Sequence, residues 1–404
     1  MKKLALAALI TASPLSPLFA AANHYGISYD NTTNSPGISQ AGSFVSHAVS
    51  LNAKQQSVVI HRLDAAFIKV YFDHVNLPAG WQLVVRSTDG KERYTYGISR
   101  QAAGVSDDFT FDPGIGQNGQ SSFAAMSISG DSATVELIPP ASAESEKAQP
   151  QVEMSHILEG YPEAVIEQLK GSDLLDMGGG DDIQSICSTD NKQRPACYTG
   201  TAFTRSKAVG RMILGGGGSC TAWRIGAGDK VMSNNHCASS NAAVTGSEIW
   251  FDYEHSACSG STTKLVKKVS GRAMLKTSAA LDYVLFTVNN ASTISDYGFL
   301  SIDPRMPVNA EQIYIPQHPG GRLKELAINS TSDTGGKCKV FNSQVGEDFT
   351  YHCDTEPGSS GSPVLASNSN KVIGLHHLGG CPNSAVRISR VWQEIGSFFN
   401  NQAP

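Results

Sequence analysis

The ten residues Asp354 to Pro363, Asp-Thr-Glu-Pro-Gly-Ser-Ser-Gly-Ser-Pro, place a serine where it could act as a nucleophile. Ser360 lies between glycines in a predicted tight turn, where the backbone N–H groups of Gly358 and Ser360 can converge on one point. A hydroxyl beside two fixed N–H donors suits acyl transfer, because the donors stabilise the oxyanion that forms when a carbonyl is attacked. Gly/Ser turns are common in loops, so this motif needs a base and an acid to predict a catalytic site.

His236 is the candidate base, at the end of an apolar β-run and next to Cys237. Cys220 lies one predicted hairpin earlier, and a Cys220–Cys237 bridge would fix the strand end that carries the imidazole. In the chain-entropy model a loop of this size contributes roughly 3 kcal/mol. Asp282 is the candidate acid, within the apolar run from Leu281 to Phe286. A buried carboxylate there needs a partner, and an imidazole N–H is a suitable one.

Each of these three residues alone would more often have a structural or surface role. Together, in the order His236, Asp282, Ser360, they predict a catalytic triad. The order disfavours a lipase or esterase of the α/β-hydrolase type, in which the serine comes first and the histidine last. For His318, in a Gln-His-Pro-Gly-Gly segment, we expect a structural role in a loop.

The elements that position these residues belong to a secreted chain. Residues 1–22 have two lysines, an apolar run and three terminal alanines, the pattern of a secretory signal peptide. The 404 residues carry a net charge of −5, which gives no basic surface for nucleic acid or an acidic membrane. We therefore expect a secreted monomer (extracellular, or periplasmic in transit) that acts on proteins or peptides. No nucleic-acid or membrane partner, cofactor or metal is expected.

All eight cysteines come after residue 186, and an exported chain with an even number of cysteines is expected to form disulfides. A metal site would need closely spaced ligands such as C-x-x-C, and the sequence has none. The cysteines are Cys187, Cys197, Cys220, Cys237, Cys258, Cys338, Cys353 and Cys381.

Because all the cysteines come after residue 186, we also predict that the chain is divided into two parts. Residues 23–140 are predicted to be a small β-sandwich-like domain, with strands at Phe67–Phe72 and Trp81–Val85 and a hairpin tip at Asp89-Gly90. Residues 141–184 are predicted to be a linker and processing region, with a short helix at Pro162–Leu175 and a hinge at Gly178–Ser185.

Residues 185–404 contain the candidate triad and consist of short predicted strands separated by Gly-rich turns. Thr221–Ile225 and Lys230–Ser233 form a predicted hairpin, and Leu281–Val288 and Lys371–Leu375 are further predicted strands. A helix over Val391–Phe399 ends the chain. This pattern is typical of an antiparallel barrel or sandwich.

Several motifs in this part resemble those of chymotrypsin-fold, trypsin-like serine endopeptidases, and are most similar to the bacterial lysyl and glutamyl endopeptidase branch. The motifs are Asn235-His236-Cys237, Leu281–Phe286, Gln317–Gly321, Gly358–Pro363 and Gly374-Leu375-His376-His377. The resemblance covers about residues 185 to 400. It implies an all-β, two-barrel fold with a C-terminal helix, made as a precursor (zymogen). His236 would be the base, Asp282 its orienter and Ser360 the nucleophile of peptide-bond hydrolysis through an acyl-enzyme.

The resemblance to lysyl endopeptidases also implies a disulfide pairing: Cys187–Cys381, Cys197–Cys258, Cys220–Cys237 and Cys338–Cys353. One departure concerns Ser359, which stands where animal-type enzymes have an aspartate that binds the amino terminus freed by activation. The oxyanion hole must then be held by other contacts, for which the Cys187 bridge is one candidate.

The residue preference before the cut has two interpretations. Asp354 matches the pocket-base position of trypsin-like enzymes, where a buried carboxylate favours Lys or Arg. Thr355 and His376 also resemble the hydroxyl and imidazole that receive the Glu side chain in glutamyl endopeptidases. We favour basic residues, because a carboxylate at the pocket base would repel Glu. The acid that lysyl endopeptidases use beyond the last bridge has no match within residues 382–390.

Two further hypotheses remain open from the sequence. The chain could be a protease-like binding protein without turnover, although the intact triad argues against this. The N-terminal β domain could be a propeptide, or an accessory module that binds carbohydrate or a surface. The hinge at Gly178–Ser185, a plausible processing site, favours the propeptide.

Overall fold

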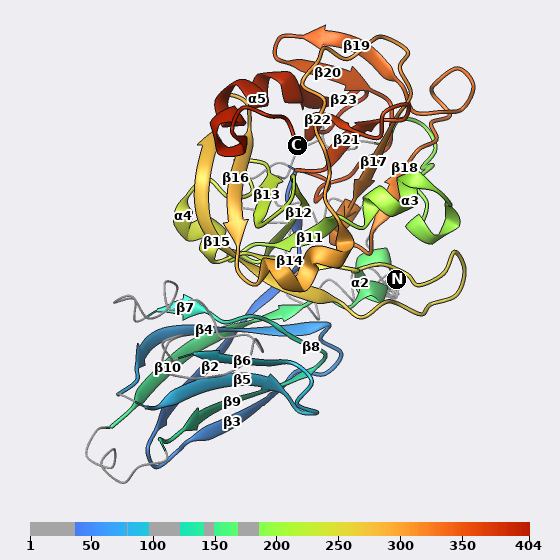
Figure 1. Cartoon of the computed structure of the whole chain (residues 1–404). Helices are drawn as coiled ribbons and strands as arrows, with labels where there is room; N and C mark the ends of the chain where they lie inside the picture. The colour runs from blue at the N-terminus through green and yellow to red at the C-terminus, as the bar shows by residue number, and fades with distance from the viewer. Residues whose placement is uncertain (1–36, 79, 97–121, 141–148, 169–185) are drawn as a thin grey trace, which may run out of the picture.

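The structure is a computed structural model that describes residues 37–78, 80–96, 122–140, 149–168 and 186–404. It consists of an N-terminal β-sandwich and a larger C-terminal part with two β-barrel units (Figure 1). The predicted signal peptide and the hinge at residues 178–185 lie outside the described residues. In the described residues, no helix has both the length and the apolar character needed to cross a membrane.

The N-terminal part is built from two sheets that face each other. One contains β2 (Gly42–Asn52), β10 (Gln151–Gly160), β4 (Phe67–Asn76), β7 (Phe123–Ala124) and β8 (Ile128–Ser129). The other contains β3 (Ser57–His61), β9 (Ser132–Ile138), β5 (Gln82–Ser87) and β6 (Arg93–Tyr96). Alternate apolar residues of both sheets form one shared core, as the sandwich pattern requires. This confirms the predicted β-sandwich-like domain.

The prediction of a linker over residues 141–184 is wrong for part of its length. Gln151–Gly160 is strand β10, which pairs with β2 on one side and β4 on the other. Val152, Met154 and Ile157 are buried in the shared core. The polar residues before Gln151 made this strand hard to recognise from the sequence. The N-terminal domain therefore extends to Gly160. The predicted short helix is present as α2 (Glu163–Gln168) in its described portion.

The first unit of the C-terminal part is a closed barrel of six strands. They are β11 (Val209–Ile213), β12 (Gly218–Arg224), β13 (Lys230–Ser233), β14 (Glu248–Phe251), β15 (Lys267–Ser278) and β16 (Tyr283–Val288). The sheet order is β12-β11-β14-β15-β16-β13, and pairing of β13 with β12 closes it. A two-residue strand from the N-terminal part, β1 (Ser39–Gln40), adds to β12. Two short helices accompany this barrel in the chain: α3 (Thr201–Ser206) precedes β11, and α4 (Asn241–Thr245) lies between β13 and β14.

The second unit is an open half-barrel of seven strands. They are β17 (Ile313–Gln317), β18 (Glu325–Ala327), β19 (Val340–Val345), β20 (Asp348–Tyr351), β21 (Pro363–Ala366), β22 (Val372–Leu378) and β23 (Asn383–Arg387). Helix α5 (Ile388–Ile395) follows and continues into a 3-10 turn at Gly396–Phe399, which confirms the predicted C-terminal helix. It buries its apolar face in a core shared by both units. The all-β, two-barrel architecture is therefore the one that the resemblance implied.

Candidate active site

Strand pairing in the first barrel brings His236 and Asp282 together. β13 and β16 are antiparallel with Ser233 opposite Val284, so the end of one strand lies beside the start of the other. His236 follows β13 and Asp282 precedes β16. The imidazole Nδ1 lies 2.7 Å from Asp282 Oδ2, and the His236 backbone N–H donates to Oδ1 at 3.0 Å. One carboxylate thus fixes both the ring and the backbone of the histidine.

Asp282 is an anion in this setting. Burial opposes its ionisation, but hydrogen bonds from His236 and His377 outweigh burial and hold the pKa of Asp282 well below its usual range. A carboxylate on Nδ1 favours the tautomer whose Nε2 accepts a proton. His236 Nε2 is buried and has no hydrogen-bond partner among the described residues. The nearby sulfurs of Cys220 and Cys237 are bonded to each other, so this group is not a metal site.

Ser360 lies in the turn that precedes β21, and contacts with both barrels hold this turn. The Thr221 N–H donates to the Ser360 carbonyl at 2.8 Å, and the Gly361 N–H donates to the His376 carbonyl at 3.0 Å. A β-carbon added to Gly37 would lie 2.4 Å from Ser360 Oγ and 3.3 Å from His236 Nε2. The hydroxyl and the free imidazole nitrogen therefore face one small space, and the structure brings the three predicted triad residues together.

Gly358, a predicted oxyanion-hole donor, has a backbone conformation that glycine adopts readily and other residues do not. Its φ is +92°, and a β-carbon there would lie 2.9 Å from the His318 carbonyl oxygen, so glycine is needed on both counts. The Gly358 N–H donates to the carbonyl oxygen of Gly37 at 2.7 Å. This is the contact that a substrate carbonyl would make, and the amide of Ser360, the second predicted donor, follows in the same turn.

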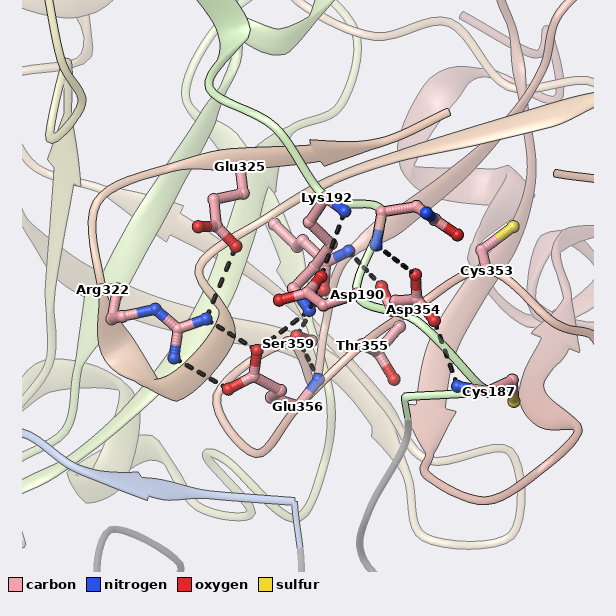
Figure 2. Close-up of polar contacts among 12 residues, drawn as sticks. Cys187, Asp190, Lys192, Arg322, Glu325, Cys353, Asp354, Thr355, Glu356 and Ser359 are labelled. Atoms are coloured by element: carbon pink, nitrogen blue, oxygen red, sulfur yellow. Dashed lines mark hydrogen bonds and ion pairs between the residues drawn. The ribbon is translucent and has the colours of Figure 1, made fainter. Parts of the chain in front are cut away.

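Buried polar contacts hold the loop that carries Gly358. Ser359, the residue that departs from the animal-type pattern, donates through Oγ to the Gln317 side chain at 2.5 Å. Glu356 lies between two cations: its carboxylate accepts two hydrogen bonds from Arg322, at 2.6 and 2.8 Å, and lies 2.9 Å from Lys192 Nζ (Figure 2). Burial opposes its ionisation, but these cations lower the pKa of Glu356 to about 2. An ion-pair cluster therefore supports the loop in addition to the Cys187 bridge.

Asp354 is buried, and backbone donors engage both of its carboxylate oxygens. Oδ1 accepts from the Cys187 N–H at 3.1 Å, and Oδ2 accepts from the Asn191 N–H at 2.8 Å (Figure 2). Burial raises the pKa of Asp354, and these hydrogen bonds and Lys192 offset only part of that effect. In these contacts the carboxylate ties the first residues of the C-terminal part to the active-site loop.

Thr355 and His376, the other candidate substrate-binding residues, are also buried. Thr355 Oγ1 donates to Asn383 Oδ1 at 3.1 Å, and the His376 Nδ1 lies 2.7 Å from the Tyr351 hydroxyl. Burial, with the nearby imidazoles, lowers the pKa of His376 to about 3, so this imidazole is neutral. His318 is apart from the triad, with Nδ1 3.0 Å from the Arg322 carbonyl, in a buried loop as the sequence indicated.

His377 is a further residue of this site, and the sequence predicts no role for it. Its Nδ1 lies 3.4 Å from Asp282 Oδ2, and its Nε2 lies 2.9 Å from Asp348 Oδ2. Burial disfavours its charge, but the two carboxylates outweigh burial and raise the pKa of His377 to about 9. The adjacent histidines His376 and His377 in β22 are the sequence signal that could have identified His377. Its partner Asp348 was not predictable, because it depends on the order of β20, β23 and β22.

Three disulfides have the pairing that the resemblance implied: Cys187–Cys381, Cys197–Cys258 and Cys220–Cys237. The fourth expected bridge is absent, because Cys338 and Cys353 are free thiols in the structure. Both are buried; Cys338 donates to the Asn329 carbonyl at 3.4 Å, and burial with the adjacent Cys338 thiol raises the pKa of Cys353 well above its usual value. Neutral thiols in such a core are unreactive.

Comparison with known proteins agrees with this geometry. The profile of the trypsin-like peptidase domain matches residues 220–375, a range that contains His236, Asp282 and Ser360. Residues 220–375 are therefore similar to a trypsin-like peptidase domain. Among solved structures, a Glu endopeptidase is 18% identical with a TM-score of 0.39, covering 54% of this chain and 100% of that one. The Rv3671c protease of M. tuberculosis is 14% identical with a TM-score of 0.35, covering 48% and 89%.

A curated relative extends the match beyond this domain. Secreted RxLR effector protein 73 of Plasmopara viticola is 31% identical over 339 residues, which is 80% of this chain and 77% of that protein. The chain belongs to the same protein family as this effector. The match is longer than the whole C-terminal part, so it includes residues of the N-terminal part as well.

Proposed function

We propose that this protein is a secreted serine endopeptidase that hydrolyses peptide bonds through an acyl-enzyme. The observation that carries the proposal is the array formed by Asp282, His236 and Ser360, beside a Gly358 amide that binds a peptide carbonyl. His236 Nε2 would take the proton of Ser360 Oγ while Oγ attacks the substrate carbonyl carbon. The oxyanion would be held by the N–H groups of Gly358 and Ser360.

The second half of the reaction uses the same residues. When the peptide C–N bond breaks, His236 would return its proton to the leaving amine, and the acyl group would stay on Ser360. A water molecule, deprotonated by His236, would then hydrolyse the ester and restore the hydroxyl. The oriented carboxylate of Asp282 would stabilise the imidazolium in both halves.

Secretion is supported by two observations. The structure contains three disulfides, which persist in oxidising compartments. The relative in Plasmopara viticola is named as a secreted protein. Both agree with the signal-peptide pattern of residues 1–22.

Two residue preferences are candidates. A preference for Lys or Arg would need the Asp354 carboxylate to face the substrate, but both of its oxygens already accept backbone hydrogen bonds. A preference for Glu would use Thr355 and the neutral His376, whose Nδ1 is held by the Tyr351 hydroxyl. If that hydroxyl donates to Nδ1, Nε2 carries the proton and can donate to a carboxylate. The Thr355 hydroxyl is engaged too, by Asn383, so the proposed preference for Glu rests on the neutral His376 imidazole.

Mass-spectrometric mapping of cleavage sites tests both the endopeptidase activity and the residue preference. The purified protein, before and after processing, is added to a denatured protein mixture, with Ser360→Ala as the matched control. Cuts after Glu that disappear in the control support the preferred specificity, and cuts after Lys and Arg reassign the pocket to Asp354. If no cut depends on Ser360 in either form, the protein is a protease-like binding protein.

A further inference from the structure

A segment of the N-terminal part lies across the candidate active site. It leaves the sandwich and runs along β12, in blue in Figure 1. In β1, Ser39 pairs with Ser219 and Gln40 pairs with Gly218, and the Ala41 N–H donates to the Gly217 carbonyl at 2.8 Å. The segment is thus bound as an added antiparallel strand, which is a common way to bind an extended peptide.

Gly37 is the residue of this segment that meets the site. Its carbonyl oxygen accepts the Gly358 N–H at 2.7 Å, so it occupies the position that a substrate oxyanion needs. A β-carbon on Gly37 would lie 2.4 Å from Ser360 Oγ and 3.3 Å from His236 Nε2. The Gly37 backbone therefore covers the nucleophile, the base and one oxyanion donor at once.

The conformation of Gly37 differs from that of a bound substrate. Its φ is +82°, in the left-handed region, whereas a peptide bound as an added strand stays extended at each residue. The chain therefore turns at Gly37, and the segment follows the strand geometry only from Ser39 onward. Two constraints require glycine at position 37: another residue would be strained at this φ, and its side chain would collide with Ser360.

Neighbouring residues of the segment are packed into the first barrel. Ile38 is 5% exposed and belongs to the barrel core that includes Met212 and Cys220. Ser39 is fully buried, and its hydroxyl lies against Gly358, where a β-carbon would approach it to 2.6 Å. The segment is therefore part of a packed interface and does not lie loosely over the surface.

The sandwich behind the segment is docked on the same barrel by buried polar groups. The Glu248 carboxylate of β14 accepts hydrogen bonds from Lys69 Nζ at 2.5 Å and from the Ser127 hydroxyl at 2.7 Å. The rings of Phe67 and Trp250 meet edge to face, with centroids 5.1 Å apart. The buried charges of Lys69 and Glu248 are thus paired across the interface, and a docked domain holds its attached segment at high local concentration.

We infer that the N-terminal domain is an intramolecular inhibitor of the peptidase domain, with Gly37 as the residue that blocks the active site. This inference rests on the proposed function. Of the two hypotheses for the N-terminal domain, a propeptide or an accessory binding module, it favours the propeptide. The interface on β12 and β14 is then the inhibitor-binding surface. Activation requires the Gly37 carbonyl to leave the Gly358 amide.

A glycine substitution tests this inference in the full, unprocessed chain. Gly37→Ala should expel the segment, and a fluorophosphonate probe that reacts with an accessible Ser360 should then label the protein faster, by roughly tenfold or more. The matched control is Gly130→Ala, because Gly130 has a similar φ of +88° but no atom within 4 Å of an added β-carbon. Labelling of Gly37→Ala at the wild-type rate, in a protein that labels after processing, would overturn the inference.

Hydrogen exchange provides a readout that does not depend on catalysis. In an Asp282→Asn background, which lowers activity but keeps the Ser360 hydroxyl, the peptide containing Gly358 should exchange more slowly with Gly37 present than in the Gly37→Ala double variant. Equal exchange in the two proteins contradicts the block at the oxyanion donor. If no form labels with the probe but this difference in exchange is present, the proposed function fails and the docking of Gly37 stands.

Discussion

The Nδ1 atom of His377 lies 3.4 Å from Oδ2 of Asp282, the carboxylate oxygen that also contacts the His236 ring. With Asp348 on its other side, His377 is a buried cation between two carboxylates. A positive charge next to Asp282 stabilises the carboxylate as an anion and fixes its orientation toward His236. His377 is thus a positioning residue, because it acts on the imidazole through Asp282.

Replacing this cation should lower the rate more than it lowers substrate binding. For His377→Gln we expect kcat to fall roughly tenfold or more, as for other residues that orient a catalytic ligand, with KM changed less. The matched control is His352→Gln, which breaks a histidine–carboxylate contact with Asp333 in the same barrel, away from the triad. Equal kinetic losses in the two variants would mean that His377 acts only through stability.

The stability contribution of His377 should disappear at alkaline pH. Its pKa is raised from 6.5 to about 9 in the folded protein, so the contribution is fully present below pH 6.5 and is lost as the pH rises through 9. Urea unfolding of the wild type and His377→Gln from pH 6 to pH 10 measures this. The difference in unfolding free energy between them should shrink across that window, and a constant difference would contradict the assignment of a charged His377.

Asp282→Asn should leave a folded protein with very little activity. The amide cannot stabilise the imidazolium and favours the wrong tautomer of His236, which costs about four orders of magnitude in kcat in the analogous triad. Steady-state kinetics with a peptide substrate, alongside a circular dichroism spectrum, would check both expectations. A rate near that of the wild type would show that another group orients His236.

Glu356→Gln should destabilise the protein strongly, because it leaves the buried side chains of Lys192 and Arg322 without their shared anion. Breaking a buried pair in this way costs about 3–5 kcal/mol. Glu347→Gln is the matched control, since its carboxylate is 45% exposed where it pairs with Arg390 and Arg387, and its loss should cost less than that of the buried Glu356. Unfolding free energies from urea titrations would separate the two, and similar losses would contradict a supporting role for the Glu356 cluster.

Removing the Cys220–Cys237 bridge should cost activity as well as stability. Its loop spans 17 residues, for which the chain-entropy model gives roughly 3 kcal/mol. The bridge also holds the strand end next to His236, so the double alanine variant should lose activity below its melting temperature. The Cys197–Cys258 double variant, whose loop spans 61 residues, should lose comparable stability and keep its activity while folded. Equal activity in the two variants would exclude a positional role.

The sequence alone was sufficient to predict three residues that the structure brings together, and the β-barrel elements that carry them. His236, Asp282 and Ser360 would each more often be structural alone, but their local patterns predict a catalytic site together: a bridged strand end, an acid in an apolar strand and a serine between glycines. The sandwich, the hairpin of β12 and β13 and the final helix follow from periodicity and turn residues. These are local signals, so they can be read from neighbouring residues.

Other features depended on residues that are far apart in the chain. Asp354 was assigned to substrate binding because its position suggested it, whereas its oxygens bind amides more than 160 residues earlier. The sequence predicts a linker where strand β10 lies, because the partners of this strand, β2 and β4, lie far upstream. The Cys338–Cys353 bridge was expected from a resemblance, but the structure has two buried thiols.

The sequence by itself thus determined which groups could do chemistry and in what order they occur. Only the tertiary structure decided what surrounds them: His377 beside Asp282, Glu356 between two cations, and Gly37 on the Gly358 amide. The physical reason is that nucleophile, base and acid need particular residue types, which a sequence displays. Charge pairing, burial and blockage depend on distances between segments, and strand order and domain docking set those distances.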